Sequence, residues 1–359
     1  MAIGKGLKKV LPECEVVCIE MADGGEGSLD VFRKTTGAGT VHLYVKNPLG
    51  REIAAEYLYG NGVAFIEMAR ASGLCLLKEE EYNPLIATSF GLGQMIFDAV
   101  DREAEHIIIG IGGSATNDGG AGMLSALGYG LLDASGNVIA PGGAPLNELA
   151  TITPGPATTR LEQIRFEVAT DVNNPLLGTS GATNVFSAQK GANSSMRQIL
   201  EKGLENFSKV TKNIAGIDYS IFPGTGAAGG VGFALKAFLG AELSPGWSIM
   251  ASLAGLEEKI ANSDLVITGE GSLDTQSLGG KLVSGIMELC HKYNKPLWIF
   301  CGVNSLNEES LNKMIKIFPL SLEEPDIEAS VKNAKIHLEN ISEKAATFLT
   351  SNKSNLQTN

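Results

Sequence analysis

Along the chain, short uninterrupted apolar runs alternate with longer segments in which apolar residues recur at helical spacing. Ile107–Ile111 and the segment DLVIT at 264–268 are apolar runs of the length of a buried strand. In Leu92–Val100 and in the segment 327–348, apolar residues recur every three or four positions, which is typical of an amphipathic helix. Runs that alternate in this way predict an α/β protein with parallel strands.

A different pattern between residues 51 and 68 indicates a second kind of sheet. Apolar and polar residues alternate from Arg51 to Tyr59, the turn Gly60-Asn61-Gly62 follows, and Val63 to Met68 is again mostly apolar. This pattern predicts a β-hairpin, and because a purely parallel sheet contains no hairpins, a mixed domain is expected to begin near here. A second hairpin is predicted around 135–137, and further strands at 15–20, 41–45, 165–170, 296–301 and 316–320.

Composition excludes several classes of protein. A chain of 359 residues has room for two or three domains. Its 28 Lys and Arg against 40 Asp and Glu give a net charge of −12, which does not suit binding to nucleic acid. No apolar run approaches the roughly 20 residues of a membrane span, and the five scattered cysteines lack a zinc spacing. We therefore expect a cytoplasmic protein with reduced thiols that binds a small molecule, and neither nucleic acid nor membrane.

Glycine is concentrated in four turns, at 23–28, 110–122, 224–232 and 269–280, and all but the third carry acids. The second turn follows the apolar run at 107–111 and leads into a predicted helix. Its glycines let backbone N–H groups approach a ligand closely, and the helix N-terminus adds partial positive charge. Ligands of α/β proteins bind beyond the carboxyl ends of the strands, so this turn predicts an anion site.

Polar side chains also follow the strand predicted at 165–170, where Asp171 and Asn173 stand at its carboxyl end. Asp171 could simply cap a helix or close an Asx-turn. An acid followed by amides at a strand end is also suited to hold Mg²⁺ or a substrate hydroxyl, and we favour this interpretation. In the first Gly-rich turn, Asp23 and Glu26 leave two interpretations open: a solvated loop with acids near a helix start, or a ligand-binding loop.

The turns together favour phosphoryl transfer, which needs N–H donors around phosphate oxygens, cations, carboxylates for Mg²⁺ and a base near the acceptor hydroxyl. Asp171 is the candidate base. Lys281 is a candidate catalytic counter-charge, because the first turn of a helix is a poor place for a cation that faces no ligand. Candidate residues for phosphate or nucleotide binding are Gly112, Gly113, Ser114, Thr116, Asn117, Gly224, Gly226, Gly229 and Gly230. Candidate metal ligands are Asp118, Glu270 and Asp274, and candidate substrate-binding residues are Asp23, Glu26, Asn173 and Lys190.

A dehydrogenase is the alternative that the pattern leaves open. GTGAAG at 224–229 and GIGGSA at 110–115 both match the dinucleotide-binding fingerprint. The second match follows a well-defined strand, and Asp133 lies at about the sequence distance at which an acid contacts the ribose. A phosphate-binding loop of the Walker A type is absent, because Leu282 follows Gly280-Lys281.

Six long motifs together resemble the bacterial glycerate kinase family: MADGGEGS at 21–28, IGIGGSATNDGGAGM at 109–123, ATDVNNPLLG at 169–178, FSAQKGA at 186–192, GTGAAGGVGFAL at 224–235 and DLVITGEGSLDTQSLGGK at 264–281. The resemblance covers nearly the whole chain. It implies ATP-dependent phosphorylation of D-glycerate with Mg²⁺, giving 2-phosphoglycerate or 3-phosphoglycerate, by a monomer or homodimer. It also implies two α/β domains. One is a Rossmann- or flavodoxin-like parallel-sheet domain from residues 1–45 and 245–359, and the other is an inserted mixed domain from residues 46–244.

The beginning of the chain departs from the family pattern. Family members typically begin with a strand and an Asp-Ser-Phe-Lys loop, whereas here Met1 falls directly on the first predicted helix. Either the start lies further upstream or the chain is truncated, and a truncated chain is expected to have an exposed sheet edge and weak or no kinase activity. An inactive glycerate-binding homologue is therefore a third hypothesis, beside the kinase and a nicotinamide-dependent oxidoreductase.

Overall fold

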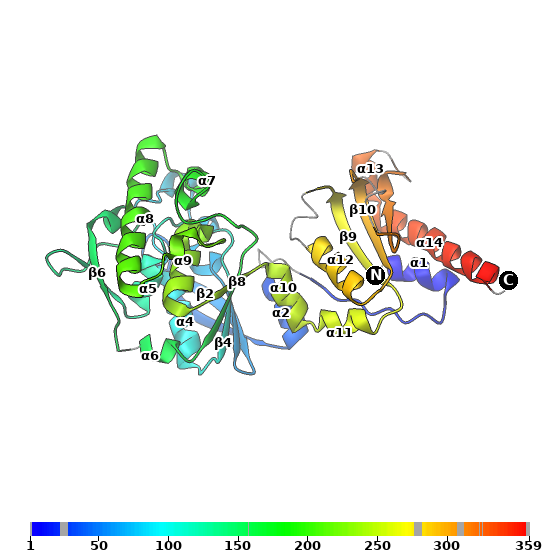
Figure 1. Ribbon diagram of the computed structural model, residues 1–359, viewed down its shortest axis with the longest axis horizontal. Helices are drawn as coiled ribbons and strands as arrows, with labels where there is room; N and C mark the ends of the chain where they lie inside the picture. The colour runs from blue at the N-terminus through cyan, green and yellow to red at the C-terminus, as the bar shows by residue number, and fades with distance from the viewer. Residues whose placement is uncertain are drawn as a thin grey trace. The chain divides into compact units, whose positions relative to one another are not determined.

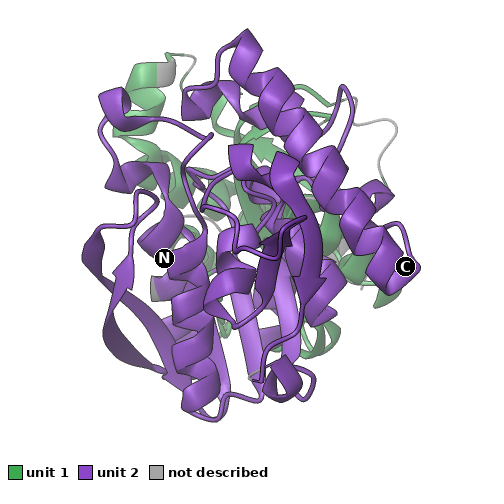
Figure 2. Cartoon of the chain, turned by 90° about the vertical axis from the view of Figure 1, so that its left-hand side faces the viewer, with its two compact units in different colours: residues 1–20, 254–359 green, residues 21–253 purple. Residues whose placement is uncertain are grey.

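The chain folds into two compact units. The computed structural model describes residues 2–21, 28–156, 158–275, 282–306, 312–322, 324 and 326–356. The smaller unit combines Met1–Glu20 with Ala254–Asn359, and the larger unit is Met21–Leu253 (Figure 2). Both ends of the chain therefore contribute to one unit, and the other unit is inserted between them.

The larger unit is organised around a six-stranded mixed sheet with the order β1-β2-β3-β4-β7-β8. Figure 1 labels β2, β4 and β8 of this sheet. The first three strands are antiparallel neighbours, which confirms the hairpin predicted between residues 51 and 68. The strands β3, β4, β7 and β8 run parallel to one another. The bounds are β1 Gly39–Lys46, β2 Glu52–Gly60, β3 Val63–Glu67, β4 His106–Gly110, β7 Arg165–Ala169 and β8 Glu242–Ser244.

Helices cover both faces of this sheet. The bounds are α2 Ser28–Thr36, α3 Ala69–Ser72, α4 Phe90–Asp101, α5 Ala121–Ala126, α6 Thr158–Leu161, α7 Ala182–Phe186, α8 Ser194–Ala215, α9 Ala227–Leu239 and α10 Gly246–Leu253. Two further strands, β5 Gly130–Asp133 and β6 Leu149–Thr153, form a separate antiparallel pair. The hairpin expected around 135–137 forms only a single bridge, between Leu132 and Val138, while β5 also pairs with β6.

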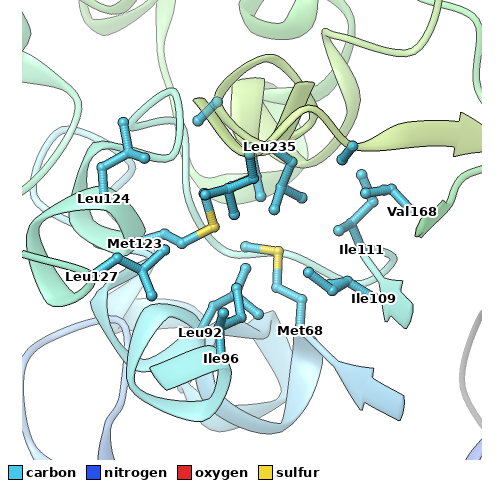
Figure 3. Packing of buried hydrophobic residues seen from close by; sticks show 14 of the residues in the cluster. Met68, Leu92, Ile96, Ile109, Ile111, Met123, Leu124, Leu127, Val168 and Leu235 are labelled. Carbon is cyan, nitrogen blue, oxygen red and sulfur yellow. The ribbon is translucent and has the colours of Figure 1, made fainter. Parts of the chain in front are cut away.

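Strand β4 is apolar throughout because both of its faces are buried. Ile107 and Ile109 pack into a core that α4, α5 and α9 complete, and Figure 3 shows Ile109 among side chains from these helices. Ile108 points to the other face, into a cluster that α2 and α10 contribute to. A strand that is covered on both sides needs no alternation of apolar and polar residues, which explains its uninterrupted sequence.

The smaller unit contains a parallel sheet with the order β11-β10-β9. Its strands are β9 Val266–Leu273, β10 Leu297–Asn304 and β11 Ile315–Pro319, and its helices are α1 Ala2–Val10, α11 Leu256–Ala261, α12 Leu282–Lys292, α13 Ile327–Lys332 and α14 Ala334–Leu356. The first and last long helices, α1 and α14, lie side by side (Figure 1). Lys9 pairs with Glu339 at 2.9 Å and Glu343 at 3.0 Å, so the two chain ends are joined by charge as well as packing.

Two expectations about this organisation differ from the structure. The strand predicted at 15–20 does not form, and Val17 is 63% exposed, so this segment lacks the burial that would offset the cost of ordering it. The unit boundaries fall at 20/21 and 253/254, whereas the sequence suggested 45/46 and 244/245. The first boundary lies before β1 and not at its end, because β1 pairs with β2 in the larger unit.

Candidate active site

A cavity of about 260 Å³ lies in the larger unit, where the parallel strands end. Its wall includes Ile111 to Ser114, which follow β4, and Ala169 to Val172, where β7 ends. The remaining lining residues are Leu74, Phe186, Gln189, Lys190, Ala227 and Ala228. The cavity therefore occupies the edge of the sheet at which α/β proteins bind their ligands.

The loop after β4 forms part of the wall of this cavity. Leu74 N donates to Gly113 O at 2.9 Å and Ala115 N donates to Ser72 O at 2.9 Å, which fixes the loop against the segment after α3. Gly113 has φ +69°, a left-handed conformation that favours glycine. Within the described part of the chain, the N–H groups of Gly112, Gly113 and Ser114 donate to no acceptor. Three successive free N–H groups in a cavity wall are suited to hold an anion.

Lys190 forms the adjacent part of the wall and is 2% exposed. It ends the short 3₁₀ helix η4 (Ala188–Lys190), and Gly191 follows in a left-handed conformation at φ +94°. Its Nζ donates to Ser114 Oγ at 2.8 Å and to the carbonyl oxygen of Thr116 at 2.7 Å. Burial lowers the pKa of Lys190 to about 7, while the charge of Asp118 acts in the opposite direction. The cavity thus contains a buried amine whose hydrogen-bond partners are neutral.

Asp171 stands at the carboxyl end of β7, and its exposed side chain lines the same cavity. Its Oδ1 accepts a hydrogen bond of 3.3 Å from Gly246 N, at the start of α10. The Asp171 side chain is therefore oriented by a backbone N–H group and is also exposed to solvent. Of the sequence candidates, Asp171, Lys190, Gly112, Gly113 and Ser114 are those that the cavity brings together.

Asp118, a candidate metal ligand, is instead a buried structural residue. Its Oδ2 accepts from Ser89 N and Ser89 Oγ, both at 2.8 Å, and from Gly122 N at 3.2 Å, while Oδ1 accepts from Gly120 N at 3.1 Å. Burial raises the pKa of the Asp118 carboxyl, and these hydrogen bonds limit the rise. The carboxylate joins the start of α4 to the start of α5, so Asp118 is not among the metal ligands that we propose.

Thr116 and Asn117 lie behind the cavity wall and are fully buried. The carbonyl oxygen of Thr116 accepts from Lys190, and Asn117 Nδ2 donates to Thr183 Oγ1 at 3.1 Å. Neither residue lines the cavity. Their side chains hold the loop in shape, and the residues of this loop that line the cavity are Ile111 to Ser114.

The glycines at 224–230 serve close packing. A Cβ on Gly229 would lie 2.0 Å from the carbonyl oxygen of Thr116, and one on Gly226 would lie 2.2 Å from that of Pro175. Gly224 and Gly230 have φ +82° and +92°, and a Cβ on either would lie 2.9 Å or less from a neighbouring atom. None of the four lines the cavity, although Ala227 and Ala228 between them do.

Neither dinucleotide fingerprint has the structural context of a nicotinamide site. The 224–229 match follows the 3₁₀ helix η5 (Tyr219–Ile221) and not a strand. The 110–115 match does follow β4, but its helix begins only at Ala121, and a tight strand-to-helix turn is what the fingerprint requires. Asp133 accepts from Ser135 N and Asn137 N, so it closes a turn. The oxidoreductase interpretation was therefore wrong in its structural premise.

The other candidates lie elsewhere. Asn173 is exposed and does not line the cavity. Glu270 and Asp274 belong to the smaller unit, on β9 and directly after it. Asp23, Glu26 and Lys281 lie outside the described residues. Among the described residues, no group of three or more His, Cys, Asp and Glu side chains could hold a metal ion.

The sequence interpretation missed a carboxylate at the same sheet edge. Glu67 ends β3 and is 5% exposed, and its Oε1 accepts from Leu29 N at 3.1 Å while Arg70 Nε donates to its Oε2 at 3.3 Å. The signal for it was an acid directly after the apolar run Val63–Ile66. Gln189, the polar neighbour of Lys190, also lines the cavity and was overlooked.

Comparison with known proteins identifies the family. The model of the glycerate kinase family matches residues 1–350. The chain belongs to the glycerate kinase family. It is 46% identical over 298 residues to glycerate 2-kinase of Escherichia coli (strain K12), covering 82% of this chain and 78% of that protein. It is 39% identical over 356 residues to glycerate kinase of Bacillus subtilis (strain 168), covering 93% of each.

A solved structure agrees with this assignment. The protein is from Salmonella typhimurium LT2 and carries a provisional assignment as glycerate kinase 2. It matches with a TM-score of 0.83 and 39% identity, over 98% of this chain and 94% of that one. Our chain is accordingly a phosphotransferase with the two-domain α/β fold of glycerate kinases. Its described helices include none that is long and apolar enough to span a membrane.

Proposed function

We propose that D-glycerate binds in the cavity of the larger unit and receives the γ-phosphoryl group of ATP there, giving 2-phosphoglycerate and ADP. The observation that supports this most strongly is the juxtaposition of three unpaired N–H groups, at Gly112 to Ser114, with the buried side chain of Lys190. ATP and D-glycerate are both anions, and the phosphoryl group that passes from one to the other is also negatively charged. A cradle of N–H groups beside an amine is suited to either a carboxylate or a phosphoryl group.

The size of the cavity fits a three-carbon acid. Sites for drug-sized ligands have volumes of about 300–1,000 Å³. The cavity has about 260 Å³, which is enough for a small organic acid together with the terminal phosphoryl group of a donor. We therefore assign this cavity to glycerate and to the transferred group.

In the proposed reaction Asp171 is the general base. The acceptor hydroxyl gives its proton to the Asp171 carboxylate as its oxygen bonds to the γ-phosphorus, and the bond between that phosphorus and the β-phosphate oxygen breaks to release ADP. In the proposal the N–H groups of the Gly112–Ser114 loop stabilise the negative charge on the transferred phosphoryl group. Lys281 remains a proposed counter-charge and Asn173 a proposed substrate contact, on their chemistry alone.

Magnesium is proposed as the metal that accompanies ATP. Mg²⁺ in kinases is usually held by one or two carboxylates with substrate phosphates and water, so a cluster of three carboxylates is not required. Glu270, an exposed carboxylate on β9, and Asp274 have suitable oxygen ligands. When bound, Mg²⁺ neutralises charge on the nucleotide phosphates.

The 2-hydroxyl is proposed as the acceptor because the relative with 46% identity is named glycerate 2-kinase. Two measurements test the kinase reaction and the choice of hydroxyl. Release of ADP is assayed with ATP, Mg²⁺ and D-glycerate, and NMR of the product then identifies the phosphorylated position. We expect glycerate-dependent ADP release and the phosphorus of the product coupled to the C2 proton. Coupling to the C3 protons would reject the 2-hydroxyl. Binding of glycerate without ADP release would support the inactive homologue instead.

A further inference from the structure

Lys190 is buried without a negatively charged partner, which is unusual for a lysine. It is among the largest fully buried side chains of the larger unit. Two of its hydrogen bonds, to Ser114 Oγ and to the Thr116 carbonyl oxygen, go to neutral groups. Among the described residues, no carboxylate forms an ion pair with it. Burial of a charge without a partner is costly, and such a group tends to lose its charge.

The charged groups that face Lys190 are few. Asp118, in the turn after β4, is the described group whose charge acts on it, and that carboxylate is already occupied by Ser89, Gly120 and Gly122. Asp171, at the end of β7, lines the same cavity but is exposed to solvent, which screens its charge. Burial is the dominant influence, and it lowers the pKa of Lys190 to about 7.

The number of N–H groups on Lys190 changes with its charge. A neutral amine has two N–H groups and a lone pair, whereas an ammonium has three N–H groups. The bonds to Ser114 Oγ and Thr116 O occupy two of them. When both bonds are kept, the neutral amine has no further N–H group to donate. The ammonium has a third N–H group, which could reach a ligand in the cavity that Lys190 lines.

An anion beside the Gly112–Ser114 loop would supply the missing negative charge. We propose that at pH 8 Lys190 is neutral in the empty cavity and takes up one proton when an anionic group, a carboxylate or a phosphoryl group, binds against the N–H groups of Gly112, Gly113 and Ser114. This inference rests on the proposed function, because it assumes that the substrate binds there. It makes Lys190 a residue that selects anionic ligands and couples their binding to pH.

Calorimetry of binding at pH 8, in two buffers that differ in ionisation enthalpy, counts the protons taken up. D-glycerate supplies the carboxylate, inorganic phosphate supplies the phosphoryl chemistry, and glycerol is the uncharged control. We expect uptake of about one proton with either anion at pH 8, much less at pH 6 where Lys190 is already charged, and no binding of glycerol. Binding of D-glycerate without proton uptake would overturn the inference and leave the proposed function standing. Absence of both D-glycerate binding and ADP release would instead reject the proposed function.

Two variants assign the proton to Lys190. Lys190→Arg keeps a permanent cation, so we expect anion binding without proton uptake, whereas Lys190→Met should bind at least tenfold more weakly and take up none. Uptake that persists in Lys190→Arg would place the proton on another group and contradict the inference. If arginine does not fit this site, NMR of the lysine side chains of the unaltered protein decides the question. One lysine signal, absent from Lys190→Met, should titrate near pH 7 and move to higher pH with phosphate; no lysine titrating below pH 9 would refute the inference.

Discussion

Lys190 and Thr116, 74 residues apart in the chain, are joined by a hydrogen bond of 2.7 Å from the lysine Nζ to the threonine carbonyl oxygen. The bond connects the 3₁₀ helix η4 to the loop after β4. Because Lys190 also donates to Ser114 Oγ, the side chain spans the loop from Ser114 to Thr116. The shape of the Gly112–Ser114 loop and the position of the buried amine are therefore coupled.

Replacement of the proposed base should affect turnover and little else. We expect Asp171→Asn to lower kcat by about 10²–10⁴-fold, with the Kd for D-glycerate and the melting temperature nearly unchanged, because an amide cannot accept the proton. Steady-state ADP release measures kcat, titration calorimetry measures the Kd, and thermal unfolding measures the melting temperature. Asp101→Asn is the matched control, since Asp101 is an exposed acid paired with Arg160 and does not line the cavity. Equal turnover in Asp171→Asn and the control would remove Asp171 from the mechanism.

Asp118 should matter for stability and not for metal binding. Asp118→Asn places an amide N–H₂ group against N–H donors, and we expect a loss of about 2–5 kcal/mol, measured by denaturant unfolding of the larger unit. Asp133→Asn is the control, because Asp133 accepts the same kind of backbone N–H bonds in an exposed turn, and its loss of stability should be much smaller than that of Asp118→Asn. A variant of Asp118 that folds normally but loses Mg²⁺ affinity would restore it as a metal ligand.

Two substitutions distinguish the close packing of the 224–230 glycines from their left-handed backbone conformation. Gly229 and Gly240 have similar left-handed φ values, +67° and +63°, but nothing lies within 4 Å of a Cβ on Gly240. Gly240→Ala should therefore cost only about 1–2 kcal/mol. Gly229→Ala should cost about 3 kcal/mol or more and raise the KM for D-glycerate, because its Cβ would push the Thr116 carbonyl that holds Lys190. Equal effects of the two substitutions on stability and KM would show that the close contact has no consequence.

The stability of the empty protein should depend on pH through Lys190. Its pKa is lowered from 10.5 to about 7 in the folded protein, so between these values the unfolded chain binds more protons and stability rises with pH. Below about pH 7 the full cost of burying the charge is present. Lys190→Met removes this cost, so we expect its gain in melting temperature to be larger at pH 6.5 than at pH 9.5. A gain that is independent of pH would show that burial does not depress this pKa.

The sequence predicted the parts of the site that depend on local pattern. The apolar run at 107–111, the Gly-rich loop after it and the polar strand end at Asp171 follow from strand and turn chemistry, and all three lie at one sheet edge. Asp118 was misinterpreted because its partner Ser89 is 29 residues away, and no local pattern reveals such a contact. The glycines at 224–230 matched a nucleotide fingerprint, but their purpose, close approach to Thr116 and Pro175, depends on tertiary packing.

The central claim is that the Gly112–Ser114 loop and Lys190 hold the substrate anion. A crystal structure of the protein with D-glycerate tests it most directly. We expect the carboxylate or an attached phosphoryl group within hydrogen-bond distance of the three N–H groups of the loop, with a hydroxyl directed toward Asp171. D-glycerate bound at another surface, with these N–H groups free of any ligand, would contradict the account.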